Sequence, residues 1–173
     1  MKRMIRSQNG QANIEFVISV LVFLITLSFV LFTIINNLPV FHRESVKDAL
    51  RSKGFQVSQL LVMDQGYPQD WSNLANAQRL GLTSGEPYIL VEDKVLALSC
   101  DGDTSYNKTK QLLGLGYQYD IIINITKINF TSGNDEQVSV CKPKTISLIA
   151  PKFWVKRFAV IDNEVVRVNV VVY

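Results

Sequence analysis

The sequence predicts an α+β protein in which a long N-terminal apolar helix is followed by a β-rich antiparallel globular head. Two observations predict this class. Residues 16–35 form an uncharged apolar run, and the C-terminal part alternates apolar with polar residues, most clearly in residues 165–173. A chain of 173 residues is long enough for one folded domain of ordinary size plus one appended element.

The apolar run of residues 16–35 has polar interruptions only at Ser19, Thr26, Ser28 and Thr33. As an α-helix it would be about 30 Å long, which is the thickness of the hydrocarbon core of a bilayer. Apolar residues lie on all sides of this helix, unlike the one-sided pattern of a helix at a globular surface. A fully buried core helix is the alternative, but a domain this small could hardly enclose it. We therefore expect a membrane span.

The charges around the run predict its orientation. Lys2, Arg3 and Arg6 precede it, and basic residues favour the cytoplasmic side of a span, so we expect the chain after about Pro39 outside the cytoplasm. These three belong to 18 Lys and Arg residues, and the other 15 balance the 15 Asp and Glu residues. A nearly neutral exterior part argues against nucleic acid as a partner, because such binding needs a basic patch.

The residues before the run do not form an ordinary secretory signal, which has a shorter apolar region followed by a small-residue cleavage site. Instead, a short basic leader ends in Gly10, Gln11 follows, and Glu15 stands directly before the apolar run. In these features the chain resembles the type IV prepilins, in the archaeal form described as class III signal peptide proteins. The Gln-x-x-Ile-Glu-Phe start is most similar to archaeal adhesion-type pilins.

The resemblance implies a route to the cell surface. A prepilin peptidase would cleave between Gly10 and Gln11 on the cytoplasmic side and leave the apolar helix attached. The product would be a single-pass plasma-membrane protein, and then, with identical or related pilin subunits, part of an extracellular type IV pilus-like filament. In a dry helix bundle Glu15 would need a cation, for which the new amino group of Gln11 on a neighbouring subunit is suited. The simpler alternative is that Glu15 only marks the cytosolic end of a membrane anchor.

These expectations divide the chain into four parts. Residues 1–10 are the cleaved leader, and residues 11–38 are the hydrophobic transmembrane or filament-core helix. Residues 39–63 are an amphipathic continuation of the helix, after a bend at Pro39. Residues 64–173 are the β-rich extracellular head.

Local patterns predict the elements of the head. Residues 88–100 are expected to be extended, with a turn at Glu92 and Asp93. Thr104 is expected to cap a short helix that runs to Leu113. Strands are then expected within residues 117–130, 136–150, 152–161 and 165–173, with residues 162–164 as the turn between the last two.

The two cysteines, Cys100 and Cys141, predict a disulfide because the head is expected outside the cytoplasm. Two free thiols are the alternative. The closed loop would contribute roughly 3–4 kcal/mol in the chain-entropy account. Neither a metal site nor a cofactor is expected, since the only histidine is His42 and no second cysteine or histidine lies near either cysteine. Residues 101–112 carry oxygen side chains but lack the glycine and the glutamate of a calcium loop.

Three Asn-x-Thr sequences, beginning at Asn107, Asn124 and Asn129, are candidate glycosylation sites on an exterior protein. The alternation of Asn124 with Ile123 and Ile125 predicts that this asparagine lies on the solvent face of a strand.

The sequence contains no nucleophile elbow, no phosphate-binding loop and no HExxH motif, so we expect no catalytic residues and no enzyme. The function that the sequence favours is a structural filament subunit for surface attachment. The alternative is a non-polymerising, membrane-anchored extracellular domain that binds a partner or a sugar. Replacement of Gly10 separates the two, because it would block processing and filament formation only in the first.

Overall fold

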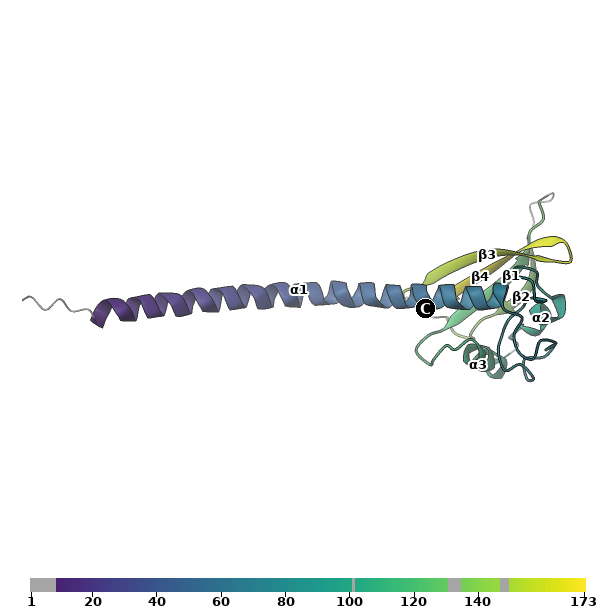
Figure 1. The fold of residues 1–173 in the computed structure, drawn as a ribbon, viewed down its shortest axis with the longest axis horizontal. Helices are drawn as coiled ribbons and strands as arrows, with labels where there is room; N and C mark the ends of the chain where they lie inside the picture. Colours follow the sequence, from purple (N-terminus) through teal and green to yellow (C-terminus); the bar gives the residue numbers. More distant parts are fainter. Residues whose placement is uncertain (1–8, 101, 131–134, 147–149) are drawn as a thin grey trace, which may run out of the picture. The chain divides into compact units, whose positions relative to one another are not determined.

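The computed structural model describes residues 9–100, 102–130, 135–146 and 150–173 (Figure 1). Its elements are α1 (Asn9–Met63), α2 (Glu92–Ala97), α3 (Asp103–Leu112), β1 (Ile121–Lys127), β2 (Glu136–Cys141), β3 (Phe153–Ile161) and β4 (Glu164–Val172). A long N-terminal helix followed by a four-stranded antiparallel sheet confirms the predicted α+β class.

The chain divides after Ser45 into two compact units. The first contains the N-terminal part of α1. The second begins at Val46 and contains the last turns of α1, both short helices and the whole sheet.

The sheet has the strand order β2-β1-β4-β3, and every neighbouring pair is antiparallel. β3 and β4 are joined by Asp162 and Asn163, whose φ angles are 48° and 67°. A two-residue hairpin turn needs such left-handed values, and Asp and Asn tolerate them better than most residues. Glu164 was expected in this turn but is the first residue of β4, paired with Ile161, because two residues suffice to reverse the chain.

One face of the sheet forms the core of the head. The alternation in β4 predicts the buried set correctly: Val166, Val168, Val170 and Val172 are all fully buried. The buried residues of the neighbouring strand β1 include Ile121, Ile123 and Ile125. Burial of such side chains contributes about 1.5–3 kcal/mol each and is the main stabilising term of the fold.

Residues 46–63 of α1 pack on this core through one side of the helix. The buried apolar side chains there are Leu50, Val57, Leu61 and Val62. Gly54 lies on the same side, and a Cβ atom at this position would stand 3.0 Å from Cδ1 of Phe153 and 3.2 Å from Cγ2 of Val155. The glycine, which lowers helix propensity, therefore leaves room for two side chains of β3.

Two predictions within the head are wrong. Residues 92–97 form the helix α2 rather than a strand, because the side chains of Lys94, Val95 and Leu98 are buried at helical rather than alternating spacing. Thr104 does not cap α3: it lies inside the helix, which begins at Asp103, and Gly102 occupies the cap position, where no side chain of the described residues makes a capping hydrogen bond.

Candidate functional site: the exposed apolar helix

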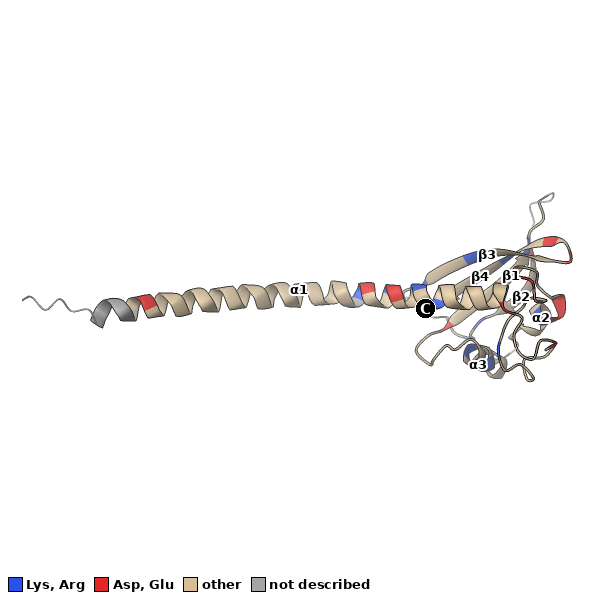
Figure 2. Ribbon diagram, viewed as in Figure 1, with Lys and Arg blue, Asp and Glu red and all other residues tan. Residues whose placement is uncertain are grey.

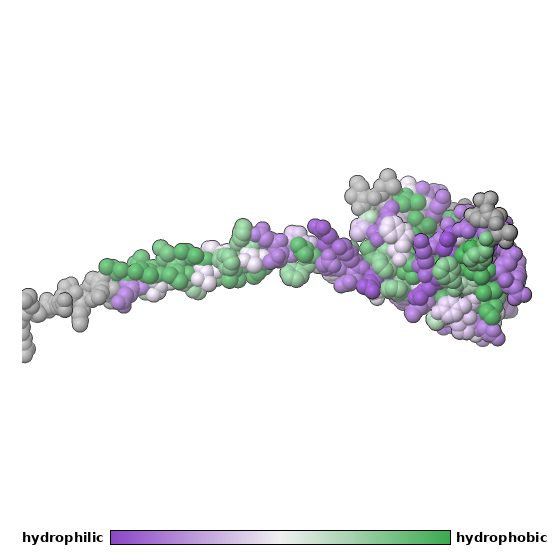
Figure 3. Space-filling model, turned by 90° about the horizontal axis from the view of Figure 1, so that it is seen from above, coloured by the Kyte–Doolittle hydropathy of each residue, from purple (hydrophilic) through white to green (hydrophobic). Residues whose placement is uncertain are grey.

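The N-terminal part of α1 has an apolar surface without any cover. Every side chain from residue 14 to residue 41 is exposed, including Phe16 and Phe29 at 69% each. Figure 3 shows hydrophobic residues along this part of the helix. Water disfavours so large an apolar surface, so this segment requires a lipid environment or other apolar helices around it.

Three of the polar side chains of this segment bond to the backbone of the helix itself. Thr26 Oγ1 donates a hydrogen bond to the carbonyl of Val22 at 2.8 Å, and Thr33 Oγ1 does the same to Phe29. In turn, Asn37 Nδ2 donates to the carbonyl of Thr33 at 2.9 Å. These bonds lower the cost of placing the three side chains in an apolar environment.

Glu15 is exposed, and no charged residue follows it in the helix before Arg43 (Figure 2). A carboxylate within hydrocarbon is costly, so its position at the edge of the apolar segment marks either a headgroup-level end or a place where a cation must meet it. Gly10 and Gln11 lie in the first residues of α1, where only the backbone is described. The basic residues of the leader lie outside the described residues.

Among the residues that the structure describes, one helix is long and apolar enough to cross a membrane, and it lies near the N-terminus. This supports a single-pass membrane anchor. The helix α1 also continues through Pro39, although a proline removes one backbone hydrogen bond.

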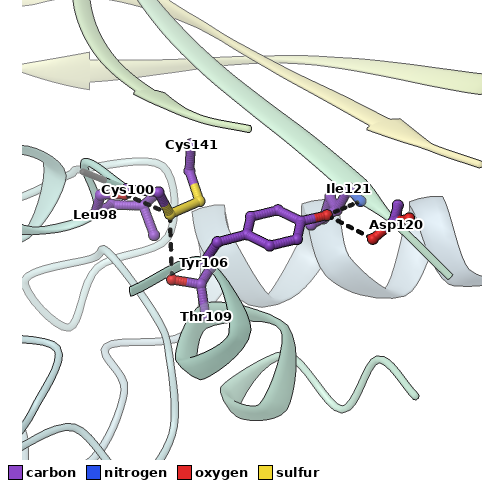
Figure 4. Close-up of a disulfide and its surroundings, with 7 residues drawn as sticks. All are labelled: Leu98, Cys100, Tyr106, Thr109, Asp120, Ile121 and Cys141. Atoms are coloured by element: carbon purple, nitrogen blue, oxygen red, sulfur yellow. Dashed lines mark hydrogen bonds between the residues drawn. A yellow bond between two sulfur atoms is a disulfide. The ribbon is translucent and has the colours of Figure 1, made fainter. Parts of the chain in front are cut away.

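The head carries a second feature that the sequence predicts, the disulfide between Cys100 and Cys141 (Figure 4). It joins the segment after α2 to the end of β2, and the backbone N–H of Cys100 also donates to the carbonyl of Val140 at 3.4 Å. Thr109 of α3 lies against the bond, with its Oγ1 3.6 Å from Sγ of Cys100. The disulfide therefore ties the loop before α3 to an edge of the sheet.

Sequence reasoning named none of the polar residues that hold α3 in place. The Tyr106 hydroxyl and the Lys110 ammonium group both donate to Oδ1 of Asp120, each at 2.9 Å. Burial, and then the Asp120 carboxylate, raise the pKa of Tyr106 above its ordinary value of 10.0. Their spacing along the chain carries no recognisable signal, because the three residues meet only after α3 packs beside β1.

The candidate glycosylation sites differ in exposure. Asn107 is exposed on α3 and Asn129 is exposed after β1, whereas Asn124 is half-buried in β1. Asn124 lies on the opposite face from Ile123, but this face is only partly open to solvent, whereas a solvent-exposed asparagine was predicted. Its Oδ1 is buried and has no hydrogen-bonding partner among the residues that the structure describes, and Thr126 of the same acceptor sequence is buried as well.

Within the described ranges, no three His, Cys, Asp or Glu side chains stand close enough together to hold a metal ion. Asp103, one of the oxygen-bearing residues of the stretch weighed as a calcium loop, instead pairs with Lys144 at 2.6 Å. Asp101 of that stretch lies outside the described residues.

Comparisons with protein-family models, with curated proteins and with solved structures give no match for this chain.

Proposed function

We propose that this protein is a structural subunit of a type IV pilus-like surface filament. The observation that carries the proposal is the helical segment of residues 16–35, which is apolar on all sides, exposed throughout, and directly preceded by the carboxylate of Glu15. A membrane anchor alone explains the apolar surface. The leader that ends in Gly10 and the carboxylate at the fifth residue after it add the features of a prepilin.

In the proposed route, a prepilin peptidase cleaves after Gly10, and the chain that begins with Gln11 stays in the plasma membrane until assembly. The helices then leave the lipid and pack against one another, so that apolar contacts between subunits replace contacts with acyl chains. Such helices associate through close packing and pairing of polar groups rather than through the hydrophobic effect. The pair formed by Glu15 and the amino group of Gln11 on the next subunit sets the axial register, and the heads form the outer surface used for attachment.

The first test is the N-terminus of the chain recovered from its native host. Intact-mass and N-terminal peptide analysis should find a chain that starts at Gln11 and retains the apolar helix. A chain that starts at Met1, or beyond residue 36, contradicts the prepilin route. Either of these two results favours the alternative, a non-polymerising domain that is anchored or released.

The second test separates processing from assembly. Gly10→Leu should leave the leader attached and abolish filaments, whereas Asn9→Ala, a neighbouring change in the leader, should leave both intact. Glu15→Gln should be processed normally but recovered in the membrane instead of in sheared filaments, because the register-setting charge is lost. The matched control Glu92→Gln removes an exposed carboxylate of the head and should assemble normally.

A further inference from the structure

A cavity of about 310 Å³ lies in the head between the segment after α1 and the start of α2. Its polar lining includes Gln65, Gln69, Asp70, Ser84, Asp93 and Lys94. Trp71 completes the wall next to Lys94. The volume lies at the lower end of the roughly 300–1,000 Å³ typical of small-molecule sites.

Lys94 is the unusual member of this lining, because only 4% of it is exposed. Its ammonium group donates to the backbone carbonyls of Gln65 at 2.7 Å and Thr83 at 3.1 Å, and it lies 5.9 Å from the centre of the Trp71 ring. Burial lowers the pKa of Lys94, and the carboxylates of Asp64 and Asp70 oppose this effect. Burial of a lysine is costly, and groups whose pKa is shifted by burial and nearby charges cluster at functional sites.

The chain around the cavity is closely packed. A Cβ at Gly66 would stand 2.6 Å from Nε1 of Trp71, and a Cβ at Gly81 would stand 2.3 Å from the carbonyl oxygen of Asp64. The Trp71 ring is fixed by its Nε1 bond to the carbonyl of Gly81 at 3.1 Å. These contacts leave no space for larger residues at the two glycines, and the hydrogen bond holds the Trp71 ring at the cavity wall.

Four polar side chains of the lining are available for a ligand, as far as the described residues show. The side chains of Gln69, Asp70, Ser84 and Asp93 make no hydrogen bond or ion pair with any described residue. They are solvent-exposed at the mouth, whereas Lys94 and Trp71 are buried at the wall. The cavity therefore presents hydrogen-bond acceptors and donors together, next to one aromatic ring.

The charges of the lining restrict the ligand. Asp70 and Asp93 outweigh the ammonium group of Lys94, which disfavours an anion, while that buried ammonium disfavours a metal ion. An apolar ligand would leave the carboxylates and amides unpaired. We propose that this cavity binds a neutral saccharide unit, whose hydroxyl groups donate to Asp70 and Asp93 and accept from the amide groups of Gln65 and Gln69.

The test uses fluorescence of the full-length protein in a polyoxyethylene detergent, which carries no sugar. The chain has two tryptophans. Trp154 is exposed, so Trp154→Phe leaves Trp71 as the only reporter. Titration with glucose, galactose, mannose and N-acetylglucosamine should give a saturable change with at least one of them. Glucuronate should bind more weakly than glucose because the carboxylates repel it.

Asp93→Asn should weaken the binding of that sugar about tenfold or more, since it removes a charged acceptor. Asp162→Asn, which removes an exposed carboxylate in the β3–β4 turn, should leave binding unchanged. Absence of saturable binding across the four sugars, tighter binding of glucuronate, or an equal affinity in Asp93→Asn would overturn the proposal. None of these results bears on filament assembly, so the two proposals fail separately.

Discussion

The Tyr106 hydroxyl donates a 2.9 Å hydrogen bond to Oδ1 of Asp120 and accepts one from the backbone N–H of Ile121 at 3.0 Å. Asp120 in turn exchanges two backbone hydrogen bonds with Tyr173, the last residue of the chain. A single side chain of α3 therefore connects to the start of β1 and, through Asp120, to the C-terminus beside β4.

Replacement of Tyr106 by Phe should lower the free energy of unfolding of the head by about 1–3 kcal/mol. The change leaves the buried N–H of Ile121 without an acceptor and removes a bond to a carboxylate, both of which are costly. Urea unfolding followed by circular dichroism measures the difference. Tyr117→Phe is the matched control, because Tyr117 is fully exposed, and it should change stability by less than about 0.5 kcal/mol.

Alkaline pH should destabilise the head partly through the same tyrosine. Burial raises the pKa of Tyr106 and of Tyr173 in the folded state, with the Asp120 carboxylate as a further cause. A raised folded pKa gives stability that is fully present below the ordinary value of 10.0 and is lost as pH rises above it. Urea unfolding at about pH 9 and pH 11 should show a smaller loss for Tyr106→Phe than for the parent chain. Equal losses would contradict this origin.

Removal of the disulfide should destabilise the head strongly. The double variant Cys100→Ser with Cys141→Ser opens a loop between residues 41 positions apart, which is worth about 4 kcal/mol in the chain-entropy account. The expected result is a lower urea midpoint. The parent chain under reducing conditions should shift in the same direction, and the double variant should not respond to reductant. A double variant as stable as the parent would show that the bond is dispensable.

Gly54→Leu should separate α1 from β3. The new side chain has no space beside Phe153 and Val155, and overpacking of this kind costs about 1–3 kcal/mol. Ser52→Leu places the same side chain on an exposed position of the same helix and serves as the control. Thermal unfolding of both variants distinguishes the outcomes: if Gly54→Leu is as stable as Ser52→Leu, the contact between α1 and β3 is loose.

Much of the fold follows from local pattern. The apolar run of residues 16–35 predicts its helix because length and composition alone match a bilayer, without any tertiary contact. The alternation in residues 165–173 predicts the buried face of β4, because the side chains of a strand alternate between its two faces. The disulfide between Cys100 and Cys141 could be predicted because the chain has only these two cysteines.

Features that depend on contacts between residues distant in sequence became visible only in the tertiary structure. Residues 92–97 contain apolar residues that suit a strand or a helix, and packing selected the helix. In the sequence, Gly54 only lowers the helix propensity of its segment, whereas in the fold the side chain of Phe153 occupies the space beside it. Lys94 reads as a surface lysine, but folding buries its ammonium group against the carbonyls of Gln65 and Thr83. In each case the deciding contact crosses a long stretch of chain, and short-range periodicity carries no information about it.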